Sequence, residues 1–265
     1  MKNNQGSVAS KLNKTQVLLH DQELAKHIPI TRRFTHSQLF DMLGHYGMVY
    51  LKPDKGARGI GVMRVEKRGR VYCYQSGIQT FTFRTFQGMF HSLRNRIGGR
   101  QYLVQKGIHV LRHHGRPFDF RVMIQKNPSR QWEPTGTVAR VAHPHKAVTN
   151  GSQGGTIYSA VNLMKAHAGK KKTAELLQKM NRIANLTADR IGREFPKLNE
   201  MGLDIAVDRN LTPWILEVNS RPDPCPFTKL DNKDAIKKIV AYAKGYGRNF
   251  CLECTKSKRA PKGFR

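Results

Sequence analysis

One segment of the sequence combines a lysine with closely spaced glycines, in a pattern that suits a bound phosphate. Lys52 lies near the end of an apolar, β-prone run, and Gly56, Gly59 and Gly61 follow it. Glycines allow the backbone N–H groups of a loop to approach a phosphate, and a lysine ammonium neutralises its charge. The pattern is neither a Walker loop nor a dinucleotide-binding turn, because we expect a strand after the glycines and not a helix. Taken alone, a glycine-rich hairpin without a ligand explains the segment equally well.

Two segments near the carboxyl end carry oxygen ligands of the kind that magnesium prefers. Glu217 and Asn219 are two residues apart, so their side chains share one face of an expected strand. Asp204 lies on the preceding expected strand, where it can face them across a hairpin. Mg²⁺ is held by a few protein oxygens together with phosphate oxygens and water. The alternative is a set of surface or salt-bridged acids, but a functional role is favoured because the chain has only 18 Asp and Glu residues.

Arginines on two neighbouring expected strands form the third candidate group. Arg121 follows Asp119 by two residues, and Arg140 lies on the expected hairpin partner. A guanidinium group can bind a phosphate or carboxylate with two hydrogen bonds and stabilise charge that develops during group transfer. A structural ion pair within the sheet is an equally good interpretation for Asp119. It is less favoured for Arg140, because Asn150 and a pair of glycines follow it.

Hydrophobic periodicity and turn residues place these groups on a framework of short strands and helices. Helices are expected at residues 10–26, 37–45, 85–97, 174–195 and 233–244. Strands are expected at residues 48–53, 62–66, 71–74, 78–83, 102–108, 118–125, 132–141, 202–207 and 214–219. Residues 149–155 contain too many glycines for regular structure and are expected to form a mobile loop. The result is an α+β fold with antiparallel sheets and helical cover.

The composition indicates a folded protein with an unusually basic surface. Hydrophobic residues make up 38% and charged residues 25% of the 265 residues, as is normal for a soluble domain. The 47 Lys and Arg residues give a net charge of +29, which attracts polyanions. These residues are spread along the chain without a nucleic-acid-binding motif, so sequence-specific recognition of nucleic acid is not expected.

The cysteines and the apolar runs bear on the location of the protein. Four cysteines, of which Cys251 and Cys254 form a lone CxxC, are expected to be incidental thiols in a reducing compartment rather than disulfides or zinc ligands. No apolar run is long enough for a membrane span, and the N-terminal residues lack the apolar core of a secretory signal. A cytoplasmic location is therefore expected.

In this order, the motifs resemble those of the ATP-grasp superfamily, and in detail they are similar to the YheC/YheD-type, endospore coat-associated family. The resemblance covers about residues 10–245. It rests on the stretches HIPIT at 27–31, YLKPDKGARGIG at 50–61, VQKGI at 104–108, RPFDFR at 116–121, VARVA at 138–142, Thr149 and Asn150 with the glycines at 154–155, and WILEVN at 214–219. Each motif alone is a weak signal, whereas the collinear set is specific.

The resemblance implies a role for each candidate residue. The loop 56–61 is expected to close over the phosphates of ATP, together with the phosphate-contacting lysines Lys52 and Lys11. The hinge that meets adenine is expected to consist of Gln105, Lys106, Gly107 and Ile108. Magnesium, or manganese in its place, is expected at Asp204, Glu217 and Asn219. The residues expected to face the transferred phosphoryl group and the acyl substrate are Arg140 and Asn150, with Arg121 as a further candidate catalytic residue.

The same resemblance divides the chain into four parts. Residues 1–30 form an N-terminal helical segment, residues 31–104 form lobe A with the glycine-rich loop, residues 105–245 form lobe B with the hinge and metal site, and residues 246–265 form a basic tail. The two α+β lobes are expected to clamp ATP between antiparallel sheets. The N-terminal α/β domain that usually precedes this fold in the superfamily is expected to be absent.

The implied activity is that of an ATP-dependent ligase, which joins a carboxylate to an amine through an acyl phosphate. Protein groups in such a reaction mainly position and neutralise the reactants. The carboxylate and the amine stay unidentified, and proteins and polymers are included among the acceptors. One alternative is a non-catalytic, spore-coat-associated nucleotide-binding or scaffold protein. A second alternative is a basic protein that binds polyanions without sequence preference. Spore association follows from the resemblance alone.

Overall fold

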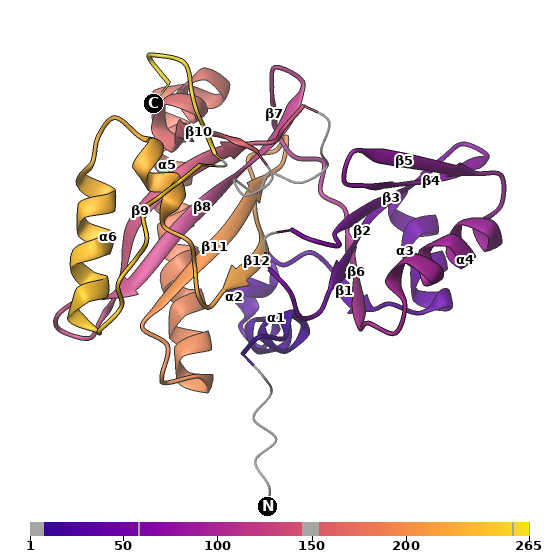
Figure 1. The fold of residues 1–265 in the computed structure, drawn as a ribbon, viewed down its shortest axis with the longest axis horizontal. Helices are drawn as coiled ribbons and strands as arrows, with labels where there is room; N and C mark the ends of the chain where they lie inside the picture. Colours follow the sequence, from indigo (N-terminus) through magenta and orange to yellow (C-terminus); the bar gives the residue numbers. More distant parts are fainter. Residues whose placement is uncertain (1–7, 58, 145–153, 256, 265) are drawn as a thin grey trace, which may run out of the picture.

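Two sheets, each with its own helices, form the two lobes of the computed structural model, which describes residues 8–57, 59–144, 154–255 and 257–264 (Figure 1). Asn150 and most of the expected loop at 149–155 therefore lie outside the described residues. The α+β class expected from the sequence is confirmed.

The first lobe contains a six-stranded antiparallel sheet in the order β1-β6-β2-β3-β4-β5. Its strands are β1 (Thr31–Arg33), β2 (Met48–Pro53), β3 (Met63–Arg68), β4 (Val71–Ser76), β5 (Gln79–Phe83) and β6 (Tyr102–Lys106). Two helices, α3 (His36–Tyr46) and α4 (Phe86–Ile97), cover one face of this sheet (Figure 1). Leu39 and Leu93 from these helices pack with Leu51 and Val65 of the sheet in one buried core.

The second lobe contains a mixed sheet in the order β12-β11-β8-β9-β10-β13, with β7 paired to β8. Its strands are β7 (Arg112–His113), β8 (Arg116–Lys126), β9 (Trp132–Val141), β10 (Thr156–Ser159), β11 (Glu200–Val207), β12 (Pro213–Asn219) and β13 (Lys258–Arg259). The helix α5 (Ala160–Glu194) covers one face, and α6 (Asp234–Gly245) covers the other (Figure 1). The short 3-10 helix η2 (Cys225–Lys229) contacts α6.

Alternation along the central strands of this sheet decides where its charged side chains point. On β8, Phe118 and Phe120 pack in the core under α5, whereas Asp119 between them faces the other way, toward Arg140. On β11, both neighbours of Asp204 are buried in the same core. The three charged side chains therefore gather on the face of the sheet opposite α5.

The single N-terminal helix expected from the sequence is two helices, α1 (Lys11–Leu19) and α2 (Gln22–Ala25). The break occurs at Asp21, whose carboxylate accepts hydrogen bonds from two backbone N–H groups in the first turn of α2. This capping satisfies donors that a continuous helix would have paired internally. Leu18 and Leu24 pack in the core of the second lobe, so both helices belong to that lobe.

The helix α5 is longer than expected, because it begins at Ala160 and not near residue 174. The Ser159 side chain accepts a hydrogen bond from the N–H of Asn162 and caps this end. Gly169 has φ 73° and ψ 173° and kinks the helix. The lysine-rich sequence around the kink has little apolar periodicity, which explains why the first part of the helix was not predicted.

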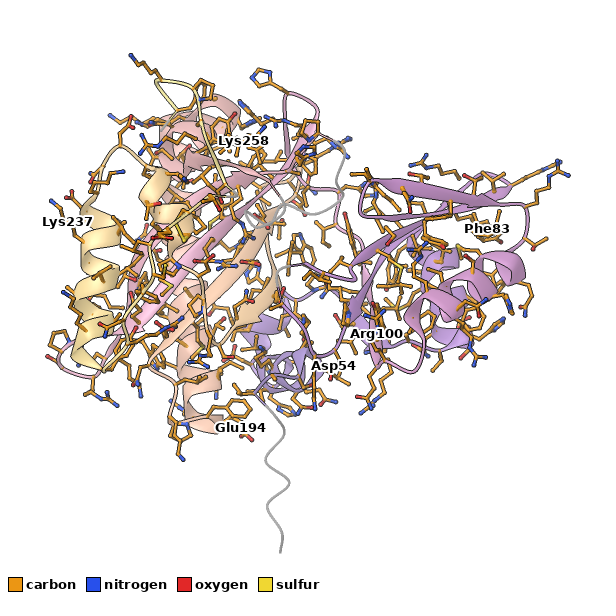
Figure 2. All side chains as sticks on the ribbon, in the orientation of Figure 1. Asp54, Phe83, Arg100, Glu194, Lys237 and Lys258 are labelled. Atoms are coloured by element: carbon orange, nitrogen blue, oxygen red, sulfur yellow. A yellow bond between two sulfur atoms is a disulfide. The ribbon has the colours of Figure 1, made fainter. Side chains whose placement is uncertain are left out.

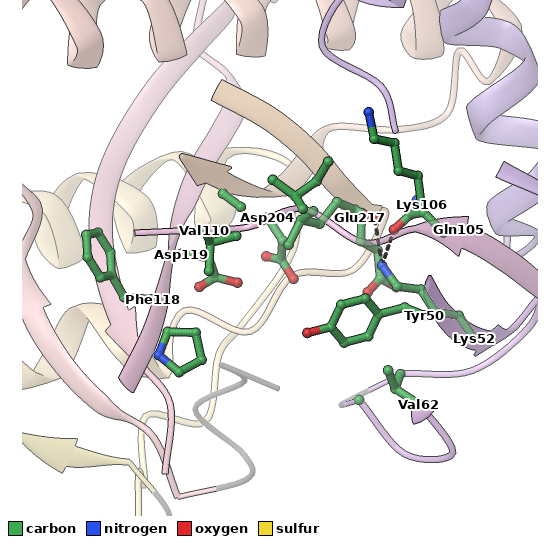
Figure 3. Close-up of a pocket in the computed structure, with 15 residues that line it drawn as sticks. Tyr50, Lys52, Val62, Gln105, Lys106, Val110, Phe118, Asp119, Asp204 and Glu217 are labelled. Carbon is green, nitrogen blue, oxygen red and sulfur yellow. Dashed lines mark hydrogen bonds between the residues drawn. The ribbon is translucent and has the colours of Figure 1, made fainter. Parts of the chain in front are cut away.

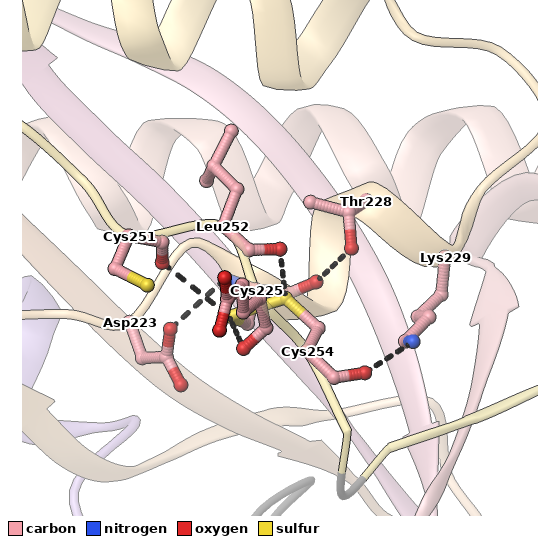
Figure 4. The surroundings of a disulfide bond; sticks show 8 residues. Asp223, Cys225, Thr228, Lys229, Cys251, Leu252 and Cys254 are labelled. Atoms are coloured by element: carbon pink, nitrogen blue, oxygen red, sulfur yellow. Dashed lines mark hydrogen bonds between the residues drawn. A yellow bond between two sulfur atoms is a disulfide. The ribbon is translucent and has the colours of Figure 1, made fainter.

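The cysteines correct a further expectation. Cys225 forms a disulfide with Cys254, which lies 29 residues later (Figure 4). Within the described ranges, Cys73 and Cys251 are free thiols. Lys229 donates a hydrogen bond to the backbone oxygen of Cys254, and β13 pairs in parallel with β10. The segment expected to be a basic tail therefore packs against the second lobe.

Basic side chains are distributed over both lobes, for example Arg100 after α4 and Lys237 on α6 (Figure 2). Within the described ranges, no helix is both long and apolar enough to cross a membrane.

Candidate functional site

A pocket of about 80 Å³ lies between the two lobes and collects residues from β2, β8, β11, β12 and the segment after β6 (Figure 3). Its lining combines apolar side chains with charged ones. The apolar residues include Val62, Ile108, Val110, Ala206 and Leu216, and the charged residues include Lys52, Asp119, Asp204 and Glu217. Such a lining suits a ligand with a flat hydrophobic group and an anionic group.

Lys52 projects from β2 into this pocket and is held by two oxygen acceptors. Its ammonium donates to the side-chain oxygen of Gln105 at 2.6 Å and to the backbone oxygen of Leu216 at 3.2 Å. Burial lowers the pKa of Lys52, because desolvation disfavours the charged form, and Glu217 opposes part of this effect. The ammonium thus lies between the hinge and a strand of the second lobe, where an anion bound between the lobes would contact it.

Lys11 connects the glycine-rich loop to the candidate metal ligands. Its ammonium donates to the backbone oxygen of Gly56 at 2.9 Å and lies 3.4 Å from a carboxylate oxygen of Glu217. Gly59 and Gly61 have φ of 69° and 78°, which side chains rarely adopt. An added Cβ at Gly61 would also lie only 2.6 Å from a neighbouring hydroxyl. The loop therefore requires glycine at these positions.

Asp54 was not among the predicted site residues, yet it joins this loop to α1. Its carboxylate accepts hydrogen bonds from the Ser10 hydroxyl at 3.0 Å and from the Leu12 N–H at 2.9 Å. Its backbone oxygen accepts a hydrogen bond from the Lys11 N–H at 3.1 Å. Asp54 thereby sets the position of Lys11 relative to the loop. The signal for this role was an aspartate directly after a strand, where Asp often bonds to nearby backbone groups.

Lys14 is a second residue that sequence reasoning missed. It follows Lys11 by one helical turn, is only 6% exposed, and lines a smaller cavity together with Lys52, Gln105 and Glu217. Burial lowers the pKa of Lys14 to about 8, although Glu217 opposes part of the effect. The spacing of the two lysines places them on one helix face, but charged positions on an amphipathic helix are usually solvated. Only the packing of α1 between the lobes distinguishes Lys14 from a surface lysine.

The hinge predicted at residues 105–108 begins with the last two residues of β6 and closes one side of the pocket. The amide of Gln105 donates to the hydroxyl of Thr31 at 3.0 Å, which orients its oxygen toward Lys52. The Gly107 N–H donates to the backbone oxygen of Met48 at 2.9 Å. The Lys106 side chain extends away from the pocket centre (Figure 3), where its ammonium packs over an aromatic ring.

Gly107→Ala is expected to lower the free energy of unfolding by about 1–3 kcal/mol. An added Cβ would lie 2.5 Å from the methyl carbon of Met48 and 2.8 Å from its backbone oxygen, so the hinge or β2 must shift. Denaturant unfolding measures the change. Gly44→Ala in α3 is the matched control, because nothing lies within 4 Å of its added Cβ and alanine favours a helix. An equal loss of stability in both variants would contradict this account of the hinge.

A connected network of buried charges lies beside the pocket. Arg140 donates to the two carboxylate oxygens of Asp119 at 2.8 and 2.6 Å and lies 3.1 Å from Asp204. Arg121 donates to Asp204 at 2.6 Å. Each of these residues is at most 6% exposed. Burial acts to raise the pKa of Asp204, but the two arginines outweigh it and leave the pKa below its ordinary value.

The three predicted metal ligands meet on β11 and β12. Asp204 and Glu217 are paired in strand register, and the amide nitrogen of Asn219 lies 3.5 Å from the second carboxylate oxygen of Asp204. In the part of the chain that the structure describes, no cluster of three or more His, Cys, Asp or Glu side chains could hold a metal by itself. Two carboxylates and an amide nevertheless fit Mg²⁺, which takes few protein ligands and completes its shell with phosphate and water.

The structure therefore brings most of the predicted site residues together. Those in or beside the pocket are Lys11, Lys52, Gly59, Gln105, Lys106, Ile108, Arg121, Arg140, Asp204, Glu217 and Asn219. Their common location depends on the approach of α1 and β2 to the face of the second sheet that carries the acids.

The sequence profile of the YheC/D like ATP-grasp family matches residues 2–249 of this chain. The chain belongs to the YheC/D-like ATP-grasp family. Among proteins of Bacillus subtilis (strain 168), the endospore coat-associated protein YheD is 27% identical over 239 residues, which are 86% of this chain and 52% of YheD. The endospore coat-associated protein YheC is 28% identical over 214 residues, which are 77% of this chain and 58% of YheC. The chain thus spans little more than half the length of these relatives.

Solved structures of ATP-grasp enzymes share the fold of this family member. D-cycloserine synthetase DcsG superposes with a TM-score of 0.56 at 13% identity and covers 89% of this chain and 69% of its own. Biotin carboxylase from Campylobacter jejuni superposes with a TM-score of 0.56 at 16% identity and covers 94% and 48%. The ATP-grasp fold expected from the motifs is confirmed.

Proposed function

We propose that this YheC/D-like protein binds Mg-ATP in the interlobe pocket and uses it to join a carboxylate to an amine through an acyl phosphate. The observation that carries the proposal is the meeting of opposite charges around Glu217, which lines both the interlobe pocket and the smaller cavity beside it. The ammonium groups of Lys11, Lys14 and Lys52 surround the carboxylate of Glu217, which lies beside Asp204 and Asn219. Lysines suit the phosphates of a nucleotide, and the carboxylate and amide oxygens suit magnesium.

Side chains in and beside the pocket suit each part of the nucleotide. The apolar side chains of Ile108, Ala206 and Leu216 suit the adenine ring, and the backbone of the hinge suits its polar edge. Lys11 and Lys52 already contact carbonyl and carboxylate oxygens, which phosphate oxygens resemble as acceptors. The glycine-rich loop beside Lys11 would then cover the phosphates.

Magnesium, or manganese in its place, would be held by Glu217, Asn219 and the carboxylate oxygen of Asp204 that the arginines do not engage. The ion supplies charge neutralisation at the phosphates. Arg121 and Arg140 act on the other oxygen of Asp204 and keep this carboxylate ionised and fixed in position. The contacts of Arg140 use Nε and Nη2, and we assign the remaining nitrogen, with Asn150, to the transferred phosphoryl group.

The proposed reaction proceeds in two steps. First, a carboxylate oxygen of the substrate attacks the γ-phosphorus of ATP, the bond from this phosphorus to its bridging oxygen breaks, and ADP leaves. The amine then attacks the acyl carbon, phosphate leaves, and the surplus proton on nitrogen passes to solvent. The protein contributes positioning and charge neutralisation, since phosphoryl transfer requires little covalent help.

The relatives extend the proposal to location. YheD and YheC are endospore coat-associated proteins, and we propose the same association for this chain. Fractionation of spores from the source organism tests it, because the protein is expected in the coat extract and not only in the mother-cell cytoplasm.

A search for product tests the proposed reaction. Purified protein is incubated with Mg-ATP, a metabolite pool and a protein fraction from cell extract, and ADP release is measured while products are compared by mass spectrometry. A product that requires the wild-type chain and is absent with Lys52→Met supports the ligase. Tight ATP binding without ADP release in any pool would instead make the chain a nucleotide-binding scaffold.

Lys14→Met is expected to weaken ATP binding about 10-fold to 100-fold, because a charge-assisted hydrogen bond to phosphate is lost. Because the pKa of Lys14 is about 8, its ammonium is charged below that pH and becomes neutral above it. The ATP affinity of the wild type is therefore expected to fall as the pH rises from 7 to 9. Lys14→Arg is expected to reduce this fall, since arginine stays charged.

Calorimetric titration with ATP at both pH values measures this effect. Lys179→Met is the matched control, because this lysine is exposed on α5 and lies outside the pocket. Equal ATP affinities for Lys14→Met and Lys179→Met would show that Lys14 does not contact the nucleotide.

A further inference from the structure

A second cavity, of about 340 Å³, opens beside the candidate nucleotide pocket. The two share the lining residues Tyr50, Ile108, Val110 and Pro117. The walls of the second cavity come from both lobes. They include side chains of β2, β3 and the β4–β5 hairpin in the first lobe, and of the β7–β8 hairpin and the β11–β12 turn in the second. The function proposed above makes no use of this cavity.

The walls of this cavity carry concentrated positive charge. Arg64, Arg112, Arg116 and Arg209 line it, and no Asp or Glu does so among the described residues. Arg64 forms a salt bridge with the neighbouring Glu66, which also pairs with Arg68. Within the described ranges, none of the other three arginines forms a salt bridge.

Two of these arginines are held in place by backbone oxygens and not by acids. Arg112 Nη1 donates to the backbone oxygen of Gly115 at 2.6 Å, and Arg116 Nη1 donates to the backbone oxygen of Ala142 at 3.4 Å. A guanidinium carries five N–H donors, so each side chain keeps further donors for a ligand. Contacts with carbonyl groups orient the guanidinium groups without cancelling their charge. Oriented guanidinium groups of this kind bind carboxylate and phosphate groups.

We propose that this cavity binds the acidic part of the substrate, which carries carboxylate or phosphate groups in addition to the carboxylate that is activated. The proposal rests on the proposed function, because the shared wall places the ligand beside the nucleotide. Like charges gathered in one concave site repel one another, and a bound polyanion offsets that repulsion. The volume lies within the range of ordinary small-molecule sites, so a short acidic chain fits.

Binding of two anionic probes tests this site on the full chain. Triglutamate and phosphoserine are titrated calorimetrically with and without a saturating non-hydrolysable ATP analogue and Mg²⁺. The variant Arg112→Gln/Arg209→Gln is expected to weaken probe binding about tenfold, because charge-assisted hydrogen bonds are lost. A stronger response to triglutamate identifies carboxylates as the recognised groups, and a stronger response to phosphoserine identifies phosphates.

The matched control is Arg94→Gln/Arg193→Gln, which removes the same charge from exposed helical positions that do not line the cavity. This control is expected to change probe binding less than twofold, and circular dichroism is expected to show that both variants are folded. If both variants weaken probe binding equally, the net charge of +29 and not the cavity attracts the probe, and the proposal is overturned.

A competition outcome would also overturn the proposal. If the ATP analogue displaces the probe and Arg112→Gln/Arg209→Gln weakens ATP binding, the cavity belongs to the nucleotide site. Failure of the proposed function has a different signature, because ATP would then fail to bind while the probe still binds in the absence of nucleotide. Simultaneous binding of probe and analogue, weakened only by the cavity variant, supports the acidic substrate.

Discussion

Glu217→Gln is expected to slow ADP formation in the complete reaction by a factor of at least about 100. Among the described residues, Glu217 is the carboxylate that both lines the pocket and contacts Lys11, and it is paired in register with Asp204. The amide has nearly the same shape, so the substitution removes a negative charge from the metal site with little change in packing. Initial rates of ADP release are measured for both chains with the metabolite pool and protein fraction that yield a product. Their ratio gives the factor.

Glu23→Gln is the matched control for this substitution. Glu23 pairs with Arg182 at the surface, where their side chains are 40% and 69% exposed, so its loss is expected to leave the rate unchanged. Manganese is expected to restore part of the activity of Glu217→Gln if the substitution acts through the metal, because it binds oxygen ligands more tightly than magnesium. A rate for Glu217→Gln within a factor of two of the wild type would show that Glu217 is not part of the metal site.

Arg140→Met is expected to lower the free energy of unfolding by about 3–5 kcal/mol, because it removes the positive charge and the two hydrogen bonds that Arg140 supplies to the buried carboxylate of Asp119. Arg140 is 2% exposed and forms two hydrogen bonds with Asp119. Denaturant unfolding measures the loss. Arg182→Met, which breaks the exposed pair with Glu23, is expected to cost at most about 1 kcal/mol.

A second variant separates the buried charge from other causes of instability. Arg140→Met/Asp119→Leu removes both partners and is expected to recover much of the stability, because no unpaired charge remains between these positions. No recovery in the double variant would contradict the ion-pair account.

Acid unfolding provides a further check. The pKa of Asp204 in the folded chain lies below its ordinary value, so this group stabilises the fold at neutral pH and loses the contribution as the pH falls through that folded-state pKa.

The longer sheet strands, and the positions of Lys52, Glu217 and Asn219 along them, were predictable because their signals are local. An apolar run ending in Lys52 and a pair of oxygen ligands at Glu217 and Asn219 follow from spacing along single strands. The strands β2, β9 and β12 lie close to where turn residues and alternation placed them. Features that are set by spacing along a single strand do not depend on contacts with distant segments.

The remaining features depend on contacts between distant segments. Lys14 is buried only because α1 packs between the lobes, and Asp54 acts only because the N-terminus of α1 meets the start of the loop. Asp119 and Arg140 were seen on neighbouring strands, but their ion pair requires the register that sets these residues opposite each other. The disulfide of Cys225 joins two segments that approach only in the folded lobe.

Mg-ATP binding between Lys52 and Glu217 is tested most directly by calorimetric titration of ATP into the wild type and Lys52→Met, each with and without Mg²⁺. The account predicts one site per chain, tighter binding with Mg²⁺, and an affinity at least tenfold weaker for Lys52→Met. An ATP affinity that is unchanged by Mg²⁺ and by Lys52→Met, and that falls steeply with added salt, would contradict this expectation. Such a result would mean that ATP is held only as an anion on a basic surface.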